Sequence, residues 1–197
     1  MGALFSFTPT NMLSNTLSLI IEIVFTLFGI ALIIRAWAYA IRLHPFNPYS
    51  QAVIRVTNWL VQPIRKVVPA SNRIDYPSLV ACWLTAFVCV LLEWLAAFGQ
   101  LPAVTVLLPA VAASALTVLK WVFNLILWMT LIQAVLSWVN PLAPIMPVLQ
   151  TLTAPLLDPI RRILPNLGGL DFSPLVLLIL AQIVVRILEN FIYSISM

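Results

Sequence analysis

The chain contains four apolar stretches, each long enough to cross a lipid bilayer as an α-helix. They run from Leu13 to Ile41, from Ser78 to Phe98, from Ala113 to Val139, and from Pro174 to Ile195. A helix needs about 20 apolar residues to cross the hydrocarbon core. Over the whole chain 62% of the residues are hydrophobic and 8% are charged, whereas about 25% are charged in soluble domains. The sequence therefore excludes a soluble globular fold and predicts a membrane protein.

Helices explain these stretches better than strands do. The apolar runs are continuous, without the alternation that is typical of membrane β-barrels. Helices also satisfy their backbone hydrogen bonds internally, as lipid requires. We therefore expect an all-α, polytopic membrane protein with four transmembrane helices. Residues Ala103 to Ala112 are apolar but too few to cross, so we expect a turn or short helix at the outer interface there.

Basic residues predict the orientation. Seven of them lie in or beside the loops after the first and third stretches: Arg42, Arg55, Arg65, Lys66, Arg73, Arg161 and Arg162. By the positive-inside rule both loops are expected to be cytoplasmic, with both termini on the opposite side. The net charge of +4 is modest and does not predict a nucleic-acid surface.

The segment after the first stretch recurs after the third. Residues 63–69 read PIRKVVP and residues 159–165 read PIRRILP, 96 positions later. The same offset aligns Pro45 with Pro141, Pro48 with Pro144, Thr57 with Thr153, Asp75 with Asp171, Leu79 with Leu175 and Glu93 with Glu189. Because each copy holds two crossings, the copies share one orientation. The predicted repeats are 13–98 and 113–195, joined by an outer-face turn at 99–112.

Each loop has the periodicity of an amphipathic helix. In the first, Val53, Val56, Leu60, Ile64 and Val67 recur at steps of three and four, which places them on one helix face. We expect both loop helices to lie in the cytoplasmic headgroup region. Pro63 and Pro159 interrupt the pattern, so each helix is expected to break there and restart, with Asp158 as the N-cap of the second piece.

The doubled motif resembles the YggT family, also called YlmG, of bacterial and plastid membrane proteins. The resemblance rests on the two PIR[KR] segments, the [IL]-D-[YF] that follows each, and the HPFNP and NPLAP segments at His44 and Asn140. It covers nearly the whole chain in the two-copy bacterial form. It implies a non-enzymatic protein of the inner membrane, linked to osmotic or potassium homeostasis, cell division or envelope organisation, and in plastids to cofactor assembly of a cytochrome b complex. It supplies no catalytic residue.

The repeated charges beside the membrane are candidate functional residues. Arg65, Lys66, Arg161 and Arg162 occur at one register in both copies. They could set topology and contact lipid phosphates, or dock a membrane or cytoplasmic protein partner. Asp75 and Asp171 directly precede the second and fourth stretches. They could cap those helices, or pair with Arg65 and Arg161 ten residues earlier.

Five charged residues within the apolar stretches are candidates for a site, since charges inside a membrane usually mark function. They are Glu22, Glu93, Lys120, Arg186 and Glu189, all expected in the outer half of the bilayer. They could meet in one cluster, either as interhelical pairs that hold the bundle or as a proton or cation site open to the outside. Cys82 and Cys89, seven positions apart on one helix, are expected to be inert thiols because that geometry excludes a disulfide.

No motif predicts catalysis or a resident cofactor. His44 is the single histidine, and there is no Walker loop, GxSxG, HExxH or CxxC, so we expect no enzyme, metal or cofactor. Two hypotheses remain. The first is a membrane scaffold or assembly factor; the second is a small channel or transporter subunit for ion or osmotic homeostasis, which would need a homo-oligomer or a partner to form a pathway.

Overall fold

The computed structural model describes residues 9–42, 48–71, 74–100, 103–163 and 171–196, and every regular element within them is a helix. In chain order these are α1 (Pro9–Ala40), α2 (Pro48–Arg65), α3 (Tyr76–Phe98), α4 (Val104–Val139), α5 (Met146–Ile163) and α6 (Ser173–Ser196). Helices α1, α3, α4 and α6 are long and apolar enough to cross a membrane. The predicted all-α, polytopic fold with four transmembrane helices is therefore confirmed.

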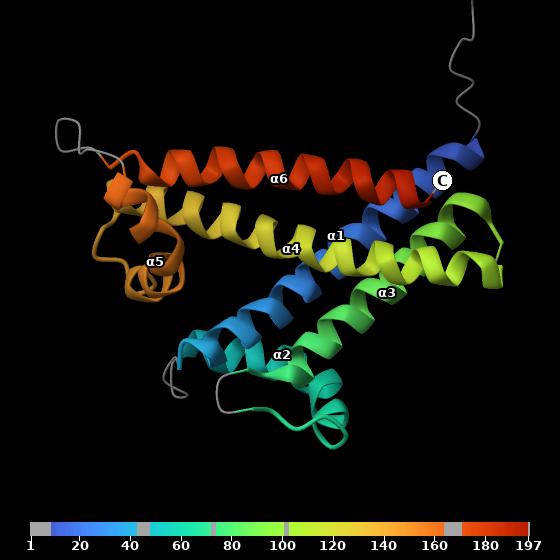
Figure 1. Cartoon of the computed structure of the whole chain (residues 1–197), viewed down its shortest axis with the longest axis horizontal. Helices are drawn as coiled ribbons and strands as arrows, with labels where there is room; N and C mark the ends of the chain where they lie inside the picture. The colour runs from blue at the N-terminus through green and yellow to red at the C-terminus, as the bar shows by residue number, and fades with distance from the viewer. Residues whose placement is uncertain (1–8, 43–47, 72–73, 101–102, 164–170, 197) are drawn as a thin grey trace, which may run out of the picture.

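The four long helices form two hairpins, one in each half of the chain. Helix α1 packs along α3, and α4 packs along α6 (Figure 1). The short helices α2 and α5 lie at the end of each hairpin remote from the α3–α4 connection (Figure 1). We call this end of the hairpins the α2/α5 side and the opposite end the connection side. Each half thus has the same order of span, short helix and span.

The expected separate turn or helix at Ala103–Ala112 is wrong, because α4 begins at Val104 directly after Ala103 and includes the rest of this segment. Pro109 lies inside this helix, and the buried residues Ala110, Ala113 and Ser114 follow it. Packing of these small residues keeps the helix continuous past the proline. At 36 residues, α4 is about 54 Å long, so it must tilt or extend beyond a core of about 30 Å.

The expected breaks in the loop helices are also wrong. Helix α2 continues to Arg65 past Pro63, and α5 runs through both Pro155 and Pro159. In α5 the prolines lie on the exposed side, while Leu152 and Leu157 are buried on the other. Packing of the buried face outweighs the lost backbone hydrogen bonds. Asp158 therefore lies within α5 and is no N-cap.

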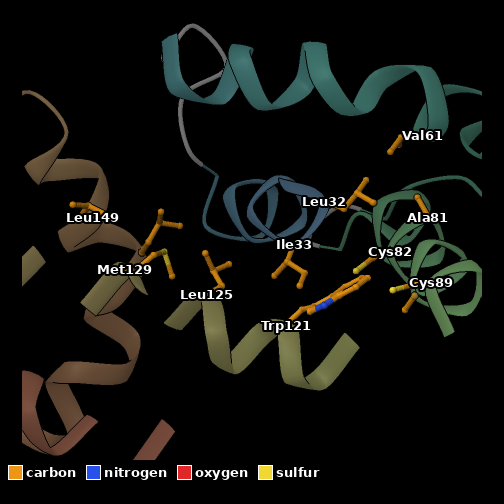
Figure 2. Close-up of a cluster of buried hydrophobic side chains, with 12 residues drawn as sticks. Leu32, Ile33, Val61, Ala81, Cys82, Cys89, Trp121, Leu125, Met129 and Leu149 are labelled. Atoms are coloured by element: carbon orange, nitrogen blue, oxygen red, sulfur yellow. The ribbon is translucent and has the colours of Figure 1, made fainter. Parts of the chain in front are cut away.

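The two hairpins meet at Trp121, a buried residue of α4 (Figure 2). Its ring lies against Gly29 of α1, where a Cβ atom would come within 2.2 Å of the ring. Cys82 of α3 contacts the carbonyl of the same glycine. A glycine at this position lets helices from both halves approach closely. As expected, Cys82 and Cys89 are free thiols, and both are buried.

A buried charge network and an inter-repeat cleft

Each short helix is tied to the span before it through a buried threonine. Thr57 of α2 accepts a hydrogen bond from Nη1 of Arg35 in α1 at 2.9 Å and donates one to the Val53 carbonyl at 2.7 Å. In α5, Thr153 contacts the side-chain oxygen of Gln133 in α4. Thr57 and Thr153 are aligned by the repeat, and both are completely buried. The same position therefore anchors the short helix in both halves, with a different partner in each.

Asp75 joins three helices of the first half at its α2/α5 side. One carboxylate oxygen lies 3.1 Å from Nη2 of Arg65, and the other lies 3.7 Å from Nε of Arg35. Ser78 donates a hydrogen bond of 2.5 Å to the carboxylate. The Asp75 side chain makes no capping hydrogen bond to the start of α3, and it is only 1% exposed. It therefore acts as a buried ion-pair centre that links α1, α2 and α3.

The corresponding group in the second half is more exposed. Nε of Arg161 lies 2.8 Å from Asp171, whose side chain is 38% exposed, and Asp158 adds a contact of 3.5 Å to Arg161. Asp171 also accepts a hydrogen bond from the backbone N–H of Ser173 at 2.9 Å. Burial raises the pKa of Asp171, but the hydrogen bonds from Ser173 and the guanidinium of Arg161 outweigh it, so the pKa lies below its ordinary value. This aspartate both pairs with its arginine and contacts the start of α6.

Arg35 is the member of this network that sequence reasoning did not single out. It lies in α1 near its end and is 7% exposed. The repeat offset places Leu131 at the corresponding position of the second copy, so a search guided by the repeat passes over it. The available signal was an arginine inside an otherwise apolar stretch, which usually has a buried partner.

The remaining basic candidates are exposed. Lys66, just after α2, and Arg162, in the last turn of α5, are both on the surface, and neither forms an ion pair with any residue in the described ranges. Exposed apolar side chains lie near them, including Val67 and Ile163. His44, Arg73 and the end of the second motif at 164–170 lie outside the described residues.

The five charged residues expected in the outer half of the bilayer form two separate ion pairs rather than one cluster of contacts. Nζ of Lys120 in α4 lies 3.2 Å from Glu22 in α1, so this pair crosses between the two halves. Glu93 of α3 lies close enough to both to interact electrostatically and accepts a hydrogen bond from Cys89 at 3.4 Å. Arg186 and Glu189 pair within α6 at 3.6 Å. A charge inside a membrane is costly, and pairing lowers that cost.

A cleft of about 800 Å³ separates the two halves. Its walls come mainly from apolar residues of α1 and α4, including Ile30, Ile34 and Leu125. Glu22, Lys120 and Glu189 line one part of it, whereas Arg35 and the first turn of α2 line another. Its volume falls within the range of about 300–1,000 Å³ of small-molecule sites. Among the described residues no three His, Cys, Asp or Glu side chains gather in a metal-binding arrangement.

Comparison with known proteins explains the two-part architecture. The model of the CCB3/YggT family matches this chain twice, at residues 14–96 and 112–192. The chain belongs to the CCB3/YggT family. The family model thus covers both hairpins, each with its short helix.

Similar proteins occur in several bacteria. The chain is 37% identical over 172 residues to the uncharacterized protein YggT of Escherichia coli (strain K12), an alignment that covers 86% of this chain and 87% of the relative. It is 35% identical over 167 residues to a Vibrio alginolyticus protein, covering 84% and 89%, and 38% identical over 167 residues to a Haemophilus influenzae protein, covering 84% and 87%. No solved structure matches the chain.

Proposed function

We propose that this YggT-family chain is a scaffold or assembly factor of the bacterial inner membrane, acting in envelope organisation, cell division or tolerance of osmotic stress. The proposal assigns no chemical reaction to it. The observation that carries it is the pair of short helices, each tied to a transmembrane helix by a buried threonine contact. Both helices end in basic residues that remain exposed. Such an arrangement presents fixed charges to a partner.

We place the α2/α5 side in the cytoplasm, since the basic residues of the chain concentrate there. Both termini would then lie on the other side of the membrane. Lys66 and Arg162 are the residues best suited to contact a partner, because the arginines beside them are engaged with Asp75 and Asp171. An acidic protein surface would fit them, and guanidinium groups bind carboxylates through two parallel hydrogen bonds.

The test is site-specific photocrosslinking at positions 66 and 162 in native membranes. We expect one defined protein to be captured at both positions and to be lost from pull-downs of Lys66→Ala/Arg162→Ala. The matched control is Arg42→Ala/Arg55→Ala, which removes two charges elsewhere on the same side. Retention of the partner by the first variant, or its equal loss from both, would contradict the proposal.

A second candidate function is a channel or transporter subunit, favoured by the cleft and by the charges that line it. Glu22, Lys120 and Glu189 border this space between the two halves. Ionisable residues inside membranes often mark ion pathways. The test compares potassium and proton flux into liposomes for the wild type and for Glu22→Gln/Glu93→Gln/Glu189→Gln. Flux that is unchanged by the three substitutions would rule this function out.

A further inference from the structure

Helix α6 carries a row of polar side chains on its exposed surface. Gln182, Arg186, Asn190 and Ser194 are all exposed and follow one another at intervals of four residues. Side chains at that spacing lie along one face of a helix. We call these four residues the α6 polar row. Arg186 is the most exposed of the charged residues in the spans, with 75% of its side chain accessible.

The row begins near the middle of the transmembrane helix. Helix α6 has 24 residues, so it is about 36 Å long. Gln182 and Arg186 both lie more than two turns from either end of it. Ionisable side chains at such depth almost always face protein or a water-filled cavity, and amides at such depth commonly hydrogen-bond to other helices. Exposure to lipid is therefore unfavourable for this face.

Among the described residues, the row has no hydrogen-bond or ion-pair partner on another helix. The face of α6 that packs against α4 bears Ala181, Val185 and Leu188, all buried. Within the described residues Arg186 pairs only with Glu189 of its own helix. The amides of Gln182 and Asn190 make no hydrogen bond to another helix in that same part of the chain.

The first copy of the repeat lacks such a row. The repeat offset aligns its four positions with Ala86, Val90, Trp94 and Phe98 of α3, which are all apolar. The side chains that α3 exposes within its span, such as Trp83, Leu84 and Val88, are apolar as well. A transmembrane helix of this family fold therefore does not need an exposed polar face. Of these two aligned helices, only α6 carries the row.

We propose that the α6 polar row is the interface between two copies of this chain, related by a twofold axis along the membrane normal. Glu189 lies beside the row and is 43% exposed. The row together with Glu189 is self-complementary, since Arg186 of one copy can pair with Glu189 of the other and the reverse contact forms at the same time. The amides of Gln182 and Asn190 both donate and accept, so they can pair across the same axis. This inference does not depend on the scaffold or transport proposals.

Cysteine crosslinking in native membranes tests which face of α6 meets the second copy. Gln182→Cys is expected to give a disulfide-linked dimer. Leu180→Cys is the matched control, because Leu180 is equally deep and half exposed but lies on another side of the helix. The native thiols are buried, so the wild type is expected to give no dimer. Equal crosslinking at positions 180 and 182, or capture of a different protein at 182, would overturn the proposal.

Charge exchange tests the pairing itself. Arg186→Glu places only carboxylates at the interface, so the dimer fraction in lipid nanodiscs is expected to fall several-fold. Arg186→Glu/Glu189→Arg restores opposite charges across the axis and is expected to recover most of the loss. Thermal unfolding of each variant reports whether it folds, and Gln182→Leu provides an uncharged variant that should also weaken the dimer. A monomeric wild type, or a dimer fraction that no variant changes, would refute the interface.

Discussion

The ring of Trp121 occupies the space that a side chain at Gly29 would need, and a Cβ atom there would lie 2.2 Å from the ring. The contact joins α1 of the first repeat to α4 of the second. We expect Gly29→Ala to lower the free energy of unfolding by about 1–3 kcal/mol, the usual cost of overpacking a core. Thermal unfolding in detergent, followed by near-ultraviolet circular dichroism, measures the effect.

A double variant supplies the control for this contact. Trp121→Leu alone removes a large buried ring and should destabilise the protein. In Gly29→Ala/Trp121→Leu the added methyl group has room. The double variant should therefore lose less unfolding free energy than the two single variants lose together. Simple additivity would show that the glycine is not needed for this approach.

The two repeated aspartates are expected to differ in their importance for stability. Asp75→Asn leaves the buried guanidinium of Arg35 without its counter-charge, and breaking a buried ion pair costs about 3–5 kcal/mol. Asp171→Asn affects a partly exposed pair, for which about 0–1 kcal/mol is typical. Chemical unfolding of both variants in the same detergent compares them directly. Equal losses would contradict the difference in burial.

The pH dependence of stability should reveal Asp171. Its folded-state pKa is below the ordinary value of 3.8, so its contribution is present above that value and is lost as the pH falls through the folded pKa. The difference in unfolding free energy between the wild type and Asp171→Asn should therefore be constant from neutral pH to about 4 and shrink below it. A difference that already declines between pH 7 and 5 would disagree with the lowered pKa.

The pair of Lys120 and Glu22 should be replaceable as a unit. Lys120→Met leaves Glu22 unpaired in α1, and a single charge within a transmembrane helix costs up to about 2.5–3.5 kcal/mol. Lys120→Met/Glu22→Gln removes both charges and should regain most of the loss. Unfolding midpoints of Lys120→Met, Glu22→Gln and the double variant give the coupling energy between the two residues. The hypothesis of a structural pair fails if the double variant is no more stable than Lys120→Met.

The sequence predicted the parts of the fold that depend on local pattern. Hydropathy predicts four spans, and the constant offset predicts the two similar halves that the hairpins display. The continuity of α4 through Pro109 was not predictable in this way, because it depends on small residues packing against other helices. The same is true of α5, where burial of Leu152 and Leu157 outweighs two prolines.

Among the charged residues, too, some contacts could be predicted from the sequence and others could not. The pairing of Asp75 and Asp171 with the arginines ten residues earlier could be named as an alternative, because both copies repeat the spacing. Arg35 could not be found through the repeat, which places a leucine at its counterpart. Likewise, charge positions alone suggested one cluster within the membrane, but the rotation of α6 directs Arg186 outward. The rotation of a helix about its own axis depends on its packing against other helices, which hydropathy and charge positions do not predict.

Because Asp75 is buried and Asp171 is partly exposed, the ion pairs of the two copies are expected to respond differently to dissolved salt. Dissolved ions screen exposed charges over about 8 Å at physiological ionic strength but reach enclosed ones far less. A rise in salt is therefore expected to weaken the ion pair between α5 and α6 more than the one around the buried Asp75. The two copies therefore differ in how strongly the surrounding electrolyte acts on the ion pair that joins the short helix to the span after it.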